Sequence, residues 1–386
     1  MSAVRQETHY FGAGPALLPS EIVSQAAADF VNYNNLGLGL GEISHRSSDA
    51  IKIVNDTKAN LVKVLNVPDT HEVLFLQGGG SGGFAAIAYN MIAAFASKTG
   101  KKGKADYFVT GDWSSKAAKE AERLGFDVNY VVDAKKANNG KFGVIPDKSQ
   151  WKFSNPEETA YVYYCDNETV AGVEFPYIPE VPEGVELVAD MSSNILSREI
   201  DVSKFGLIFG GAQKNIGIAG VSFYIVKKSL YENRISDKEL VALGIPLAPI
   251  VFDFATIAKN NSTYNTLPIF GVHVINLCLL KMLANGGLSN QQKISERKAE
   301  LIYKTLDKYP QVFNLPVDKS VRSKMNIVFT LKEEDAFLSQ AAARGLTGLK
   351  GHRSVGGIRI SNYNAVSEES VKLLVEFIEK FAATQQ

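Results

Sequence analysis

Cysteine is scarce in this chain of 386 residues, which contains only Cys165 and Cys278. Two cysteines cannot build a disulfide framework or a zinc site made of several thiolates. The five histidines are scattered and never show the H-x-x-x-H spacing of a helical zinc site. We therefore expect no metal centre.

The sequence also lacks an excess of either charge. Lys plus Arg and Asp plus Glu both number 41, so the formal net charge is zero. A neutral chain gives no electrostatic reason to bind nucleic acid or an anionic membrane surface. No hydrophobic run approaches the ~18 residues of a membrane span, and residues 1–7 lack the apolar core of a signal peptide. We expect a soluble, cytoplasmic protein with neither nucleic acid nor a membrane as partner.

Hydrophobic residues make up 45% of the chain and charged residues 21%, which is enough to build a sizeable core. From residue 20 to about residue 260, apolar stretches alternate with stretches of helical periodicity. This alternation is typical of an α/β domain with a largely parallel sheet.

Beyond residue 265 the pattern changes to long helices, near residues 270–285 and 289–308, followed by a strand at 325–330. These elements indicate a smaller α+β unit. We predict a large domain of residues 16–262 and a small C-terminal domain of residues 263–386, which also takes up residues 1–15.

Lys214 lies between two apolar stretches, residues 205–209 and 221–226, which we interpret as buried strands. An unpaired buried ammonium is costly, so a lysine at such a place suggests that its amine carries chemistry. Asp190 ends another apolar stretch upstream. Pyridoxal phosphate requires a lysine that forms a Schiff base and a carboxylate that keeps its ring nitrogen protonated. A lone lysine after a strand is more often a surface residue, so other signals are needed.

A glycine-rich segment, residues 77–83, follows an apolar strand and precedes a helix that we expect from residue 84. Backbone N–H groups at such a place can bind a phosphate at the positive end of the helix dipole. The segment also satisfies the dinucleotide pattern G-x-G-x-x-G, with Asp112 as a candidate ribose ligand at a somewhat late spacing. We favour a monophosphate site that includes Gly80 and Ser81. A nicotinamide-dependent oxidoreductase is the alternative.

Several polar or aromatic residues follow apparent strands. They are Gly80, Trp113, Thr169, Asp190 and Lys214. Ligands of an open parallel sheet gather outside the carboxyl ends of its strands, so we expect these five residues to meet at one edge. Singly, Trp113 is more often a core residue and Thr169 more often a turn residue.

The matching segments that carry a family resemblance are residues 11–16, 42–47, 77–84, 167–170, 190–193, 211–217, 264–266 and 351–357. In these segments and over essentially its whole length, the chain resembles the phosphoserine aminotransferase family, and its fungal members in particular. These are class V aminotransferases of fold type I. The resemblance implies a pyridoxal-phosphate-dependent transferase fold, in which a large domain with a mostly parallel sheet flanked by helices is joined to a smaller α+β C-terminal domain.

The resemblance implies a role for each residue around the cofactor ring. Lys214 holds pyridoxal 5′-phosphate and shuttles a proton, and Asp190 pairs with the ring nitrogen. Trp113 stacks on the ring and Thr169 binds its phenolic oxygen.

The residues implied for the cofactor phosphate are Gly80, Ser81, Gln213, Asn265 and Thr266. In the family the last two reach the phosphate from a second subunit. The resemblance therefore implies a homodimer with active sites at the interface.

The implied activity is phosphoserine transamination in serine biosynthesis. In this reversible reaction, O-phospho-L-serine and 2-oxoglutarate are converted into 3-phosphohydroxypyruvate and L-glutamate. A candidate further substrate is 4-phosphohydroxy-L-threonine. Each substrate has two acidic ends, which suit arginine forks and clustered donors. The resemblance assigns Arg359 to the α-carboxylate. It assigns the distal phosphate or carboxylate to His45, Arg46, His352 and Arg353, some of them across the dimer. Taken separately, the two His-Arg pairs are more often solvated basic loops.

Ala171 stands where the family pattern leads us to expect histidine, and we expect altered packing or a changed hydrogen bond there rather than lost activity. Two alternatives stay open, another class V aminotransferase and a non-catalytic protein that binds phosphometabolites through its basic loops. A cysteine desulfurase is disfavoured because no cysteine follows Cys278.

Overall fold

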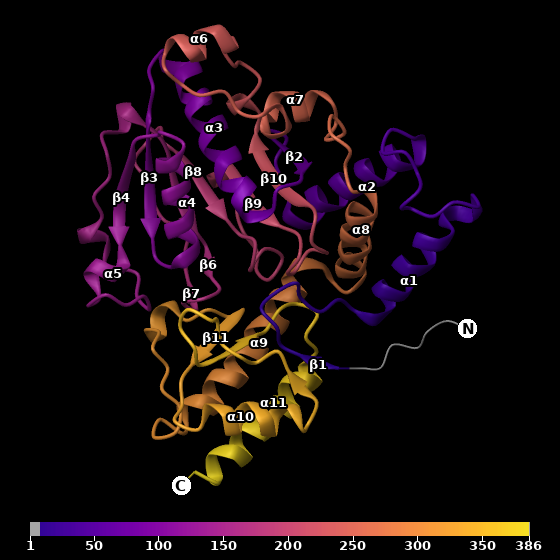
Figure 1. Ribbon diagram of the computed structural model, residues 1–386, viewed down its shortest axis with the longest axis vertical. Coiled ribbons are helices and arrows are strands. Elements are labelled where there is room, and N and C mark those ends of the chain that lie inside the picture. Colours follow the sequence, from indigo (N-terminus) through magenta and orange to yellow (C-terminus); the bar gives the residue numbers. More distant parts are fainter. Residues whose placement is uncertain (1–7, 386) are drawn as a thin grey trace.

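The computed structural model of the chain describes residues 8–385. Two predictions concern residues 1–7 in part and to that extent lie outside the described residues. One is that no signal peptide is present, and the other is that the N-terminal segment belongs to the small domain. Figure 1 shows a large sheet with helices on both faces and, beside it, a smaller unit formed mainly by the C-terminal part of the chain.

A seven-stranded sheet forms the centre of the larger part. In sheet order its strands are β2 (His71–Leu76), β10 (Ser222–Lys227), β9 (Leu207–Gly211), β8 (Glu186–Asp190), β5 (Thr159–Cys165), β3 (Lys104–Val109) and β4 (Val128–Asp133). Neighbouring strands are parallel except at β10, which is antiparallel to both β2 and β9. The predicted α/β class with a mostly parallel sheet is confirmed. Because β10 reverses the direction on both sides, β2 ends at the same edge as β9, β8, β5 and β3.

Helices cover both faces of this sheet. One face carries α2 (Ser48–Leu65) and α8 (Ile269–Ala284), and the other carries α3 (Gly79–Thr99), α4 (Asp112–Arg123) and α7 (Phe254–Lys259). Successive strand residues point to opposite faces. Val162 and Tyr164 therefore lie in the core on the α2 side, whereas Tyr161 and Tyr163 lie in the core on the α3 side. Burial on both faces explains why the strands are apolar throughout.

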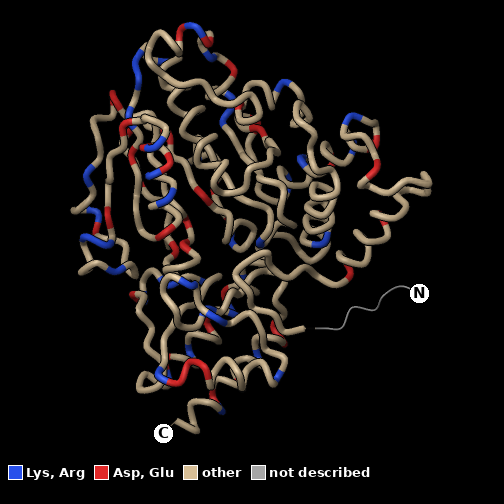
Figure 2. The backbone as a smooth tube through the Cα atoms, viewed as in Figure 1, with Lys and Arg blue, Asp and Glu red and all other residues tan. Residues whose placement is uncertain are grey.

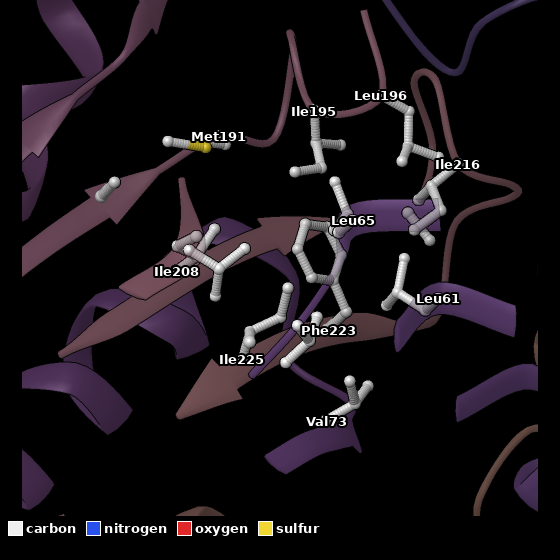
Figure 3. Close-up of a cluster of buried hydrophobic side chains, with 14 of the residues drawn as sticks. Leu61, Leu65, Val73, Met191, Ile195, Leu196, Ile208, Ile216, Phe223 and Ile225 are labelled. Carbon is white, nitrogen blue, oxygen red and sulfur yellow. The ribbon is translucent and has the colours of Figure 1, made fainter. Parts of the chain in front are cut away.

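Figure 3 shows the core between the sheet and α2, where Ile208 of β9 and Phe223 and Ile225 of β10 lie together with Leu61 and Leu65 of α2. Burying a side chain of this size stabilises the fold by roughly 1.5–3 kcal/mol relative to leaving it exposed. This packing fixes α2 on the sheet, and α2 in turn lies along α8.

The smaller unit consists of β1 (His9–Tyr10), α9 (Gly287–Asp307), β11 (Asn326–Phe329), α10 (Glu334–Ala342), β12 (Leu346–Thr347), β13 (Ile358–Ser361) and α11 (Glu368–Ala383). β11 pairs antiparallel with β13, and β1 pairs parallel with β12. A separate core holds these elements together, in which Phe337 packs against Phe377 and Phe381. The remaining labelled elements are α1 (Ser20–Val31), α5 (Ala134–Ala137), β6 (Asn167–Glu168), β7 (Val173–Glu174) and α6 (Asp237–Ala242).

The division into domains of residues 16–262 and 263–386 stays a prediction. Helix α8 lies in the second range, yet its Ile275 is buried in the core of the large sheet. Helix α9 is bent by 87° relative to α8 and contributes Ile302 to the separate core. We therefore propose that the small domain begins at α9.

Figure 2 shows Lys and Arg interspersed with Asp and Glu over both parts of the molecule, as the zero net charge leads one to expect. Within residues 8–385, no single helix is long and apolar enough to cross a membrane. The bent pair of α8 and α9 would pass such a test only when the two helices are counted together.

Candidate active site

A cavity of about 510 Å³ lies at the edge where the parallel strands end. The predicted site residues that line it are Gly80, Ser81, Trp113, Thr169, Asp190, Gln213, Lys214, His352 and Arg359. All five residues expected to meet at one edge are among them. The order of the strands brings them together, because each of these five follows a strand that ends at this edge.

Asp190, the last residue of β8, is a buried carboxylate with few donors. Its Oδ1 accepts hydrogen bonds from the backbone N–H (2.9 Å) and the hydroxyl (2.6 Å) of Ser192. Its Oδ2 receives only a long bond of 3.4 Å from the Tyr163 hydroxyl. Burial raises the pKa of the Asp190 carboxyl, and the Ser192 hydrogen bonds and the Lys214 charge offset part of this rise. Oδ2 thus has room for a strong, cationic donor inside the cavity.

Lys214 lies in the connection between β9 and β10 and is half-buried. Its Nζ is 5.8 Å from the centre of the Trp113 ring. The backbone beside it is held by a 2.8 Å hydrogen bond from Ala16 N–H to the carbonyl of Gln213. The aliphatic stem runs past Gly14, where an added Cβ would lie 3.5 Å from Cγ of the lysine. The amine and the indole therefore face the same cavity.

Trp113 and Thr169 are joined by a direct hydrogen bond. The indole Nε1–H donates to Thr169 Oγ1 at 2.8 Å. The Thr169 carbonyl in turn accepts a 3.1 Å hydrogen bond from the guanidinium of Arg359. The two residues predicted to contact the cofactor ring are thus linked to the residue predicted to bind a substrate carboxylate.

The glycine-rich segment differs from the prediction, because helix α3 begins at Gly79 and not near residue 84. Gly80 and Ser81 therefore lie in its first turn, where helical N–H groups have no partner within the helix. The glycines allow close packing, since a Cβ on Gly83 would lie 2.1 Å from the Phe209 ring. The dinucleotide interpretation is not supported, because β2 lies at the edge of the sheet and four strands separate it from β3, after which Asp112 begins α4.

Arg359 belongs to β13 of the smaller unit, whose pairing with β11 places its half-buried guanidinium in the cavity. His352 lies in the loop before β13, where its Nδ1 is 2.6 Å from the Ser354 hydroxyl. Burial and the nearby charge of Arg359 lower the pKa of His352. Arg353, the next residue, is exposed and does not line the cavity.

Besides Arg353, four predicted residues do not line the cavity, and we call them the peripheral cluster: His45, Arg46, Asn265 and Thr266. Gln77 holds two of them, since it accepts a hydrogen bond from Asn265 Nδ2 (3.1 Å) and donates one to the Thr266 carbonyl (2.5 Å). Arg46 reaches the Tyr264 carbonyl at 3.5 Å. The predicted site residues of one chain therefore lie partly in the cavity lining and partly in the peripheral cluster outside it.

Pyridoxal phosphate fits the cavity by the chemistry of its lining. The buried and weakly paired Oδ2 of Asp190 suits a protonated ring nitrogen, and Lys214 supplies the amine. The indole of Trp113 offers an aromatic face. The first turn of α3, with the Ser81 hydroxyl, suits a phosphate.

Some residues of the site escaped the sequence analysis. Ser192 and Tyr163 are the donors to Asp190, and Glu168 accepts hydrogen bonds from the backbone of Trp113 and from Ser114. The signal that could have found Glu168 is its place, as an acidic residue, just after the buried strand β5. Ala171 packs beside an apolar cluster that contains Val173, so the place where histidine was expected borders on aliphatic side chains. Within residues 8–385, no group of three or more His, Cys, Asp or Glu side chains is placed to hold a metal ion.

Comparison with known proteins identifies the family. The model of the family described as Aminotransferase class-V matches residues 8–374. A phosphoserine aminotransferase of Saccharomyces cerevisiae is 52% identical over 391 residues, covering 99% of each chain. That of Drosophila melanogaster is 44% identical, with 96% of this chain and 97% of the relative covered. The expected similarity to fungal members agrees with the yeast relative.

Solved structures give the same result. Phosphoserine aminotransferase from Bacillus circulans subsp. alkalophilus superimposes with a TM-score of 0.88 at 37% identity, covering 98% of this chain and 99% of that one. PLP-bound phosphoserine aminotransferase from Trichomonas vaginalis gives a TM-score of 0.86 at 36% identity, covering 97% of this chain and all of that one (100%). These similarities confirm the predicted fold-type I architecture. The chain belongs to the phosphoserine aminotransferases of the class V family and is a pyridoxal-phosphate-dependent aminotransferase.

Proposed function

We propose that this enzyme transfers an amino group from O-phospho-L-serine to 2-oxoglutarate, and from L-glutamate to 3-phosphohydroxypyruvate in the reverse direction. The observation that carries the proposal is that one cavity unites Lys214 and Asp190 with the guanidinium of Arg359 and the imidazole of His352. The first pair suits the cofactor, and the second pair suits substrates with two acidic ends.

When bound, pyridoxal phosphate supplies an electron sink for the electrons of the substrate Cα–H bond. The Lys214 amine holds the cofactor and is the base that moves the α-proton of the substrate. The Asp190 carboxylate holds a proton at the ring nitrogen, and this counter-charge lowers the cost of keeping the carboxylate ionised in its buried position. Trp113 covers a face of the ring, and the Thr169 hydroxyl orients it.

The Arg359 and His352 side chains recognise the acidic ends of the substrates. The Arg359 guanidinium is already fixed at one end by the Thr169 carbonyl, and its remaining N–H groups are available to a planar α-carboxylate. His352 faces the same cavity and is a donor for the distal phosphate or carboxylate, as is Arg353 beside it.

We also propose that the enzyme is a homodimer whose peripheral cluster completes the site of the partner subunit. Two observations support this. The peripheral cluster carries phosphate-binding chemistry, yet it lies outside the cavity of its own chain. Large apolar side chains are exposed at the end of α1 and just after it, including Phe30 (51%), Val31 (75%) and Leu36 (49%), and exposed apolar side chains of this kind are typical of an interface.

Finer points of the function stay predictions. We propose 4-phosphohydroxy-L-threonine as a second substrate, because it shares the phosphate and the α-amino acid. We also propose that the enzyme is cytoplasmic and that its reaction belongs to serine biosynthesis. A glyoxylate aminotransferase is the second candidate, but the likeness to alanine–glyoxylate aminotransferase, at 17% identity and a TM-score of 0.67, extends to the fold alone.

An assay of 2-oxoglutarate-dependent deamination tests this proposal. Phosphoserine, serine and alanine are compared as amino donors with the purified enzyme, and the absorption spectrum is recorded in parallel. We expect turnover of phosphoserine well above that of the other two, and a band near about 410–430 nm that is absent in Lys214→Ala. Equal turnover of alanine and phosphoserine would contradict the substrate assignment while leaving the aminotransferase class intact.

A further inference from the structure

Glu168 is a fully buried carboxylate beside the cofactor cavity that the proposed chemistry does not use. Its Oε2 accepts a hydrogen bond from the Trp113 N–H at 2.9 Å. Its Oε1 accepts one from the Ser114 N–H at 2.8 Å and one from the Ser114 hydroxyl at 2.5 Å. We propose that Glu168 is a positioning residue that caps helix α4 from a distant segment and thereby holds Trp113 and Thr169 in place for the cofactor.

The first turn of α4 begins at Asp112, and its Ser114 hydroxyl accepts hydrogen bonds only from the preceding N–H groups of Thr110 (3.0 Å) and Gly111 (3.1 Å). The residue at its N-cap is Gly111, and no side chain there accepts a hydrogen bond from the helix. The free N–H groups of a helix start need an acceptor, and a negative charge is favoured at that end of the helix dipole. Glu168 supplies both. The glycine is required, because a Cβ on Gly111 would lie 2.2 Å from the carboxyl carbon of Glu168.

Two consecutive residues hold Trp113 at its two ends. Glu168 binds its backbone N–H, and Thr169 binds its indole Nε1–H. Since Thr169 Oγ1 accepts from the indole, its own hydroxyl proton is free to point toward another acceptor in the cavity. A shift of the start of α4 therefore moves the aromatic face and the hydroxyl together.

A carboxylate is needed here, and an amide would not replace it. Two backbone N–H groups and one hydroxyl converge on the two oxygens of Glu168, so both oxygens must accept. An amide turns its NH2 group toward at least one N–H donor and leaves that donor unpaired. Burial raises the pKa of Glu168 to about 7, against the lowering effect of these donors, and Asp112 adds to the rise.

Tryptophan fluorescence tests this inference without relying on turnover. The chain has two tryptophans, so Trp151→Phe leaves Trp113 as the single emitter. In this background and without cofactor, we expect Glu168→Gln to shift the emission maximum and to raise quenching by acrylamide severalfold. On addition of pyridoxal phosphate, we expect about 10-fold weaker binding, as for the loss of a buried hydrogen bond to a charged group.

Asp106→Asn is the matched control. Asp106 is also fully buried and accepts three hydrogen bonds, two from Ser154 and one from Asn129, but it does not line the cavity. We expect this variant to lose stability while it keeps the emission of Trp113 and the cofactor affinity. Unchanged emission and affinity in Glu168→Gln, or equal changes in both variants, would overturn the proposal.

Gly111→Ala provides a second variant that leaves Glu168 in place, for the case that Glu168→Gln does not fold. Its methyl group displaces the carboxylate, so the same changes at Trp113 are expected, and their absence would count against the proposal. The inference about Glu168 rests on the proposed cofactor site, but different results would contradict the inference and the proposed function. If the parent protein bound no pyridoxal phosphate, the proposed function would fail. If it bound and Glu168→Gln bound equally well, only the positioning role would fail.

Discussion

The strands that they end or follow pointed to five residues of the cavity, whereas only the family resemblance pointed to the peripheral cluster, and different layers of the fold place the two groups. Asp190 and Lys214 follow neighbouring strands, so the sheet itself brings them together. Arg46 precedes α2 and Asn265 precedes α8, and these two helices pack against each other on one face of the sheet. The comparison teaches that strand order alone is enough to place the first group at the cavity, whereas the place of the second group beside the helices leads us to propose that another copy of the chain uses it.

The largest effect is expected for Lys214→Ala. Removal of the amine takes away the group that holds the cofactor and moves the proton, so we expect transamination to fall by at least about 10³-fold. Steady-state assays with phosphoserine and 2-oxoglutarate measure the loss. Lys204→Ala, which changes an exposed lysine upstream of β9, is the control and should keep full activity. Full turnover in Lys214→Ala would refute the assignment of the cavity.

Mixing two inactive variants tests whether the peripheral cluster acts across a dimer. Lys214→Ala and Arg46→Ala are unfolded and refolded together in equal amounts. A mixed dimer then has one site with an intact lysine and the partner's intact arginine, so activity should recover to about a quarter of the wild-type value.

The pair Lys214→Ala with Arg359→Ala is the matched control for this experiment. Both residues line the cavity of one chain, so no mixed dimer has an intact site and no recovery is expected. Failure of the first pair to recover, with each variant shown to be dimeric, would mean that Arg46 does not act in the partner's site.

Arg359→Ala should weaken both amino donors to a similar degree. The loss of a charge-assisted hydrogen bond to the α-carboxylate corresponds to roughly 10–100-fold in KM for glutamate and for phosphoserine. The comparison of the two KM values is the measurement. If only one donor were affected, Arg359 would bind a distal group and not the shared carboxylate.

The smallest effect concerns pH and His352. Its pKa in the free protein is lowered by burial and by Arg359, and a bound phosphate dianion favours the protonated ring and raises this pKa again. Binding therefore takes up a proton, so phosphoserine should bind more tightly as the pH falls from about 8 to 6, by a few-fold beyond the titration of the phosphate itself. We expect His352→Gln to abolish this additional dependence. An identical pH profile of KM in both proteins would contradict a role for His352 in binding the phosphate.

The sequence was sufficient to predict what depends on local pattern. Asp190 and Lys214 could be found because each follows an apolar stretch, and the parallel sheet then places both at one edge. The start of α3 was missed because glycine is a poor helix former, and only the fit of Gly83 against Phe209 explains a helix there. Glu168 was missed because its role depends on α4, which comes more than forty residues earlier in the chain.

The antiparallel strand β10 has a mechanical consequence for the lysine. After β9 the chain returns directly along the neighbouring strand, so the connection that carries Lys214 is anchored at both of its ends by strands inside the sheet. In the role we propose for it, Lys214 would bind and release the cofactor by rotation of its flexible side chain, while the strands on either side hold its main chain in place.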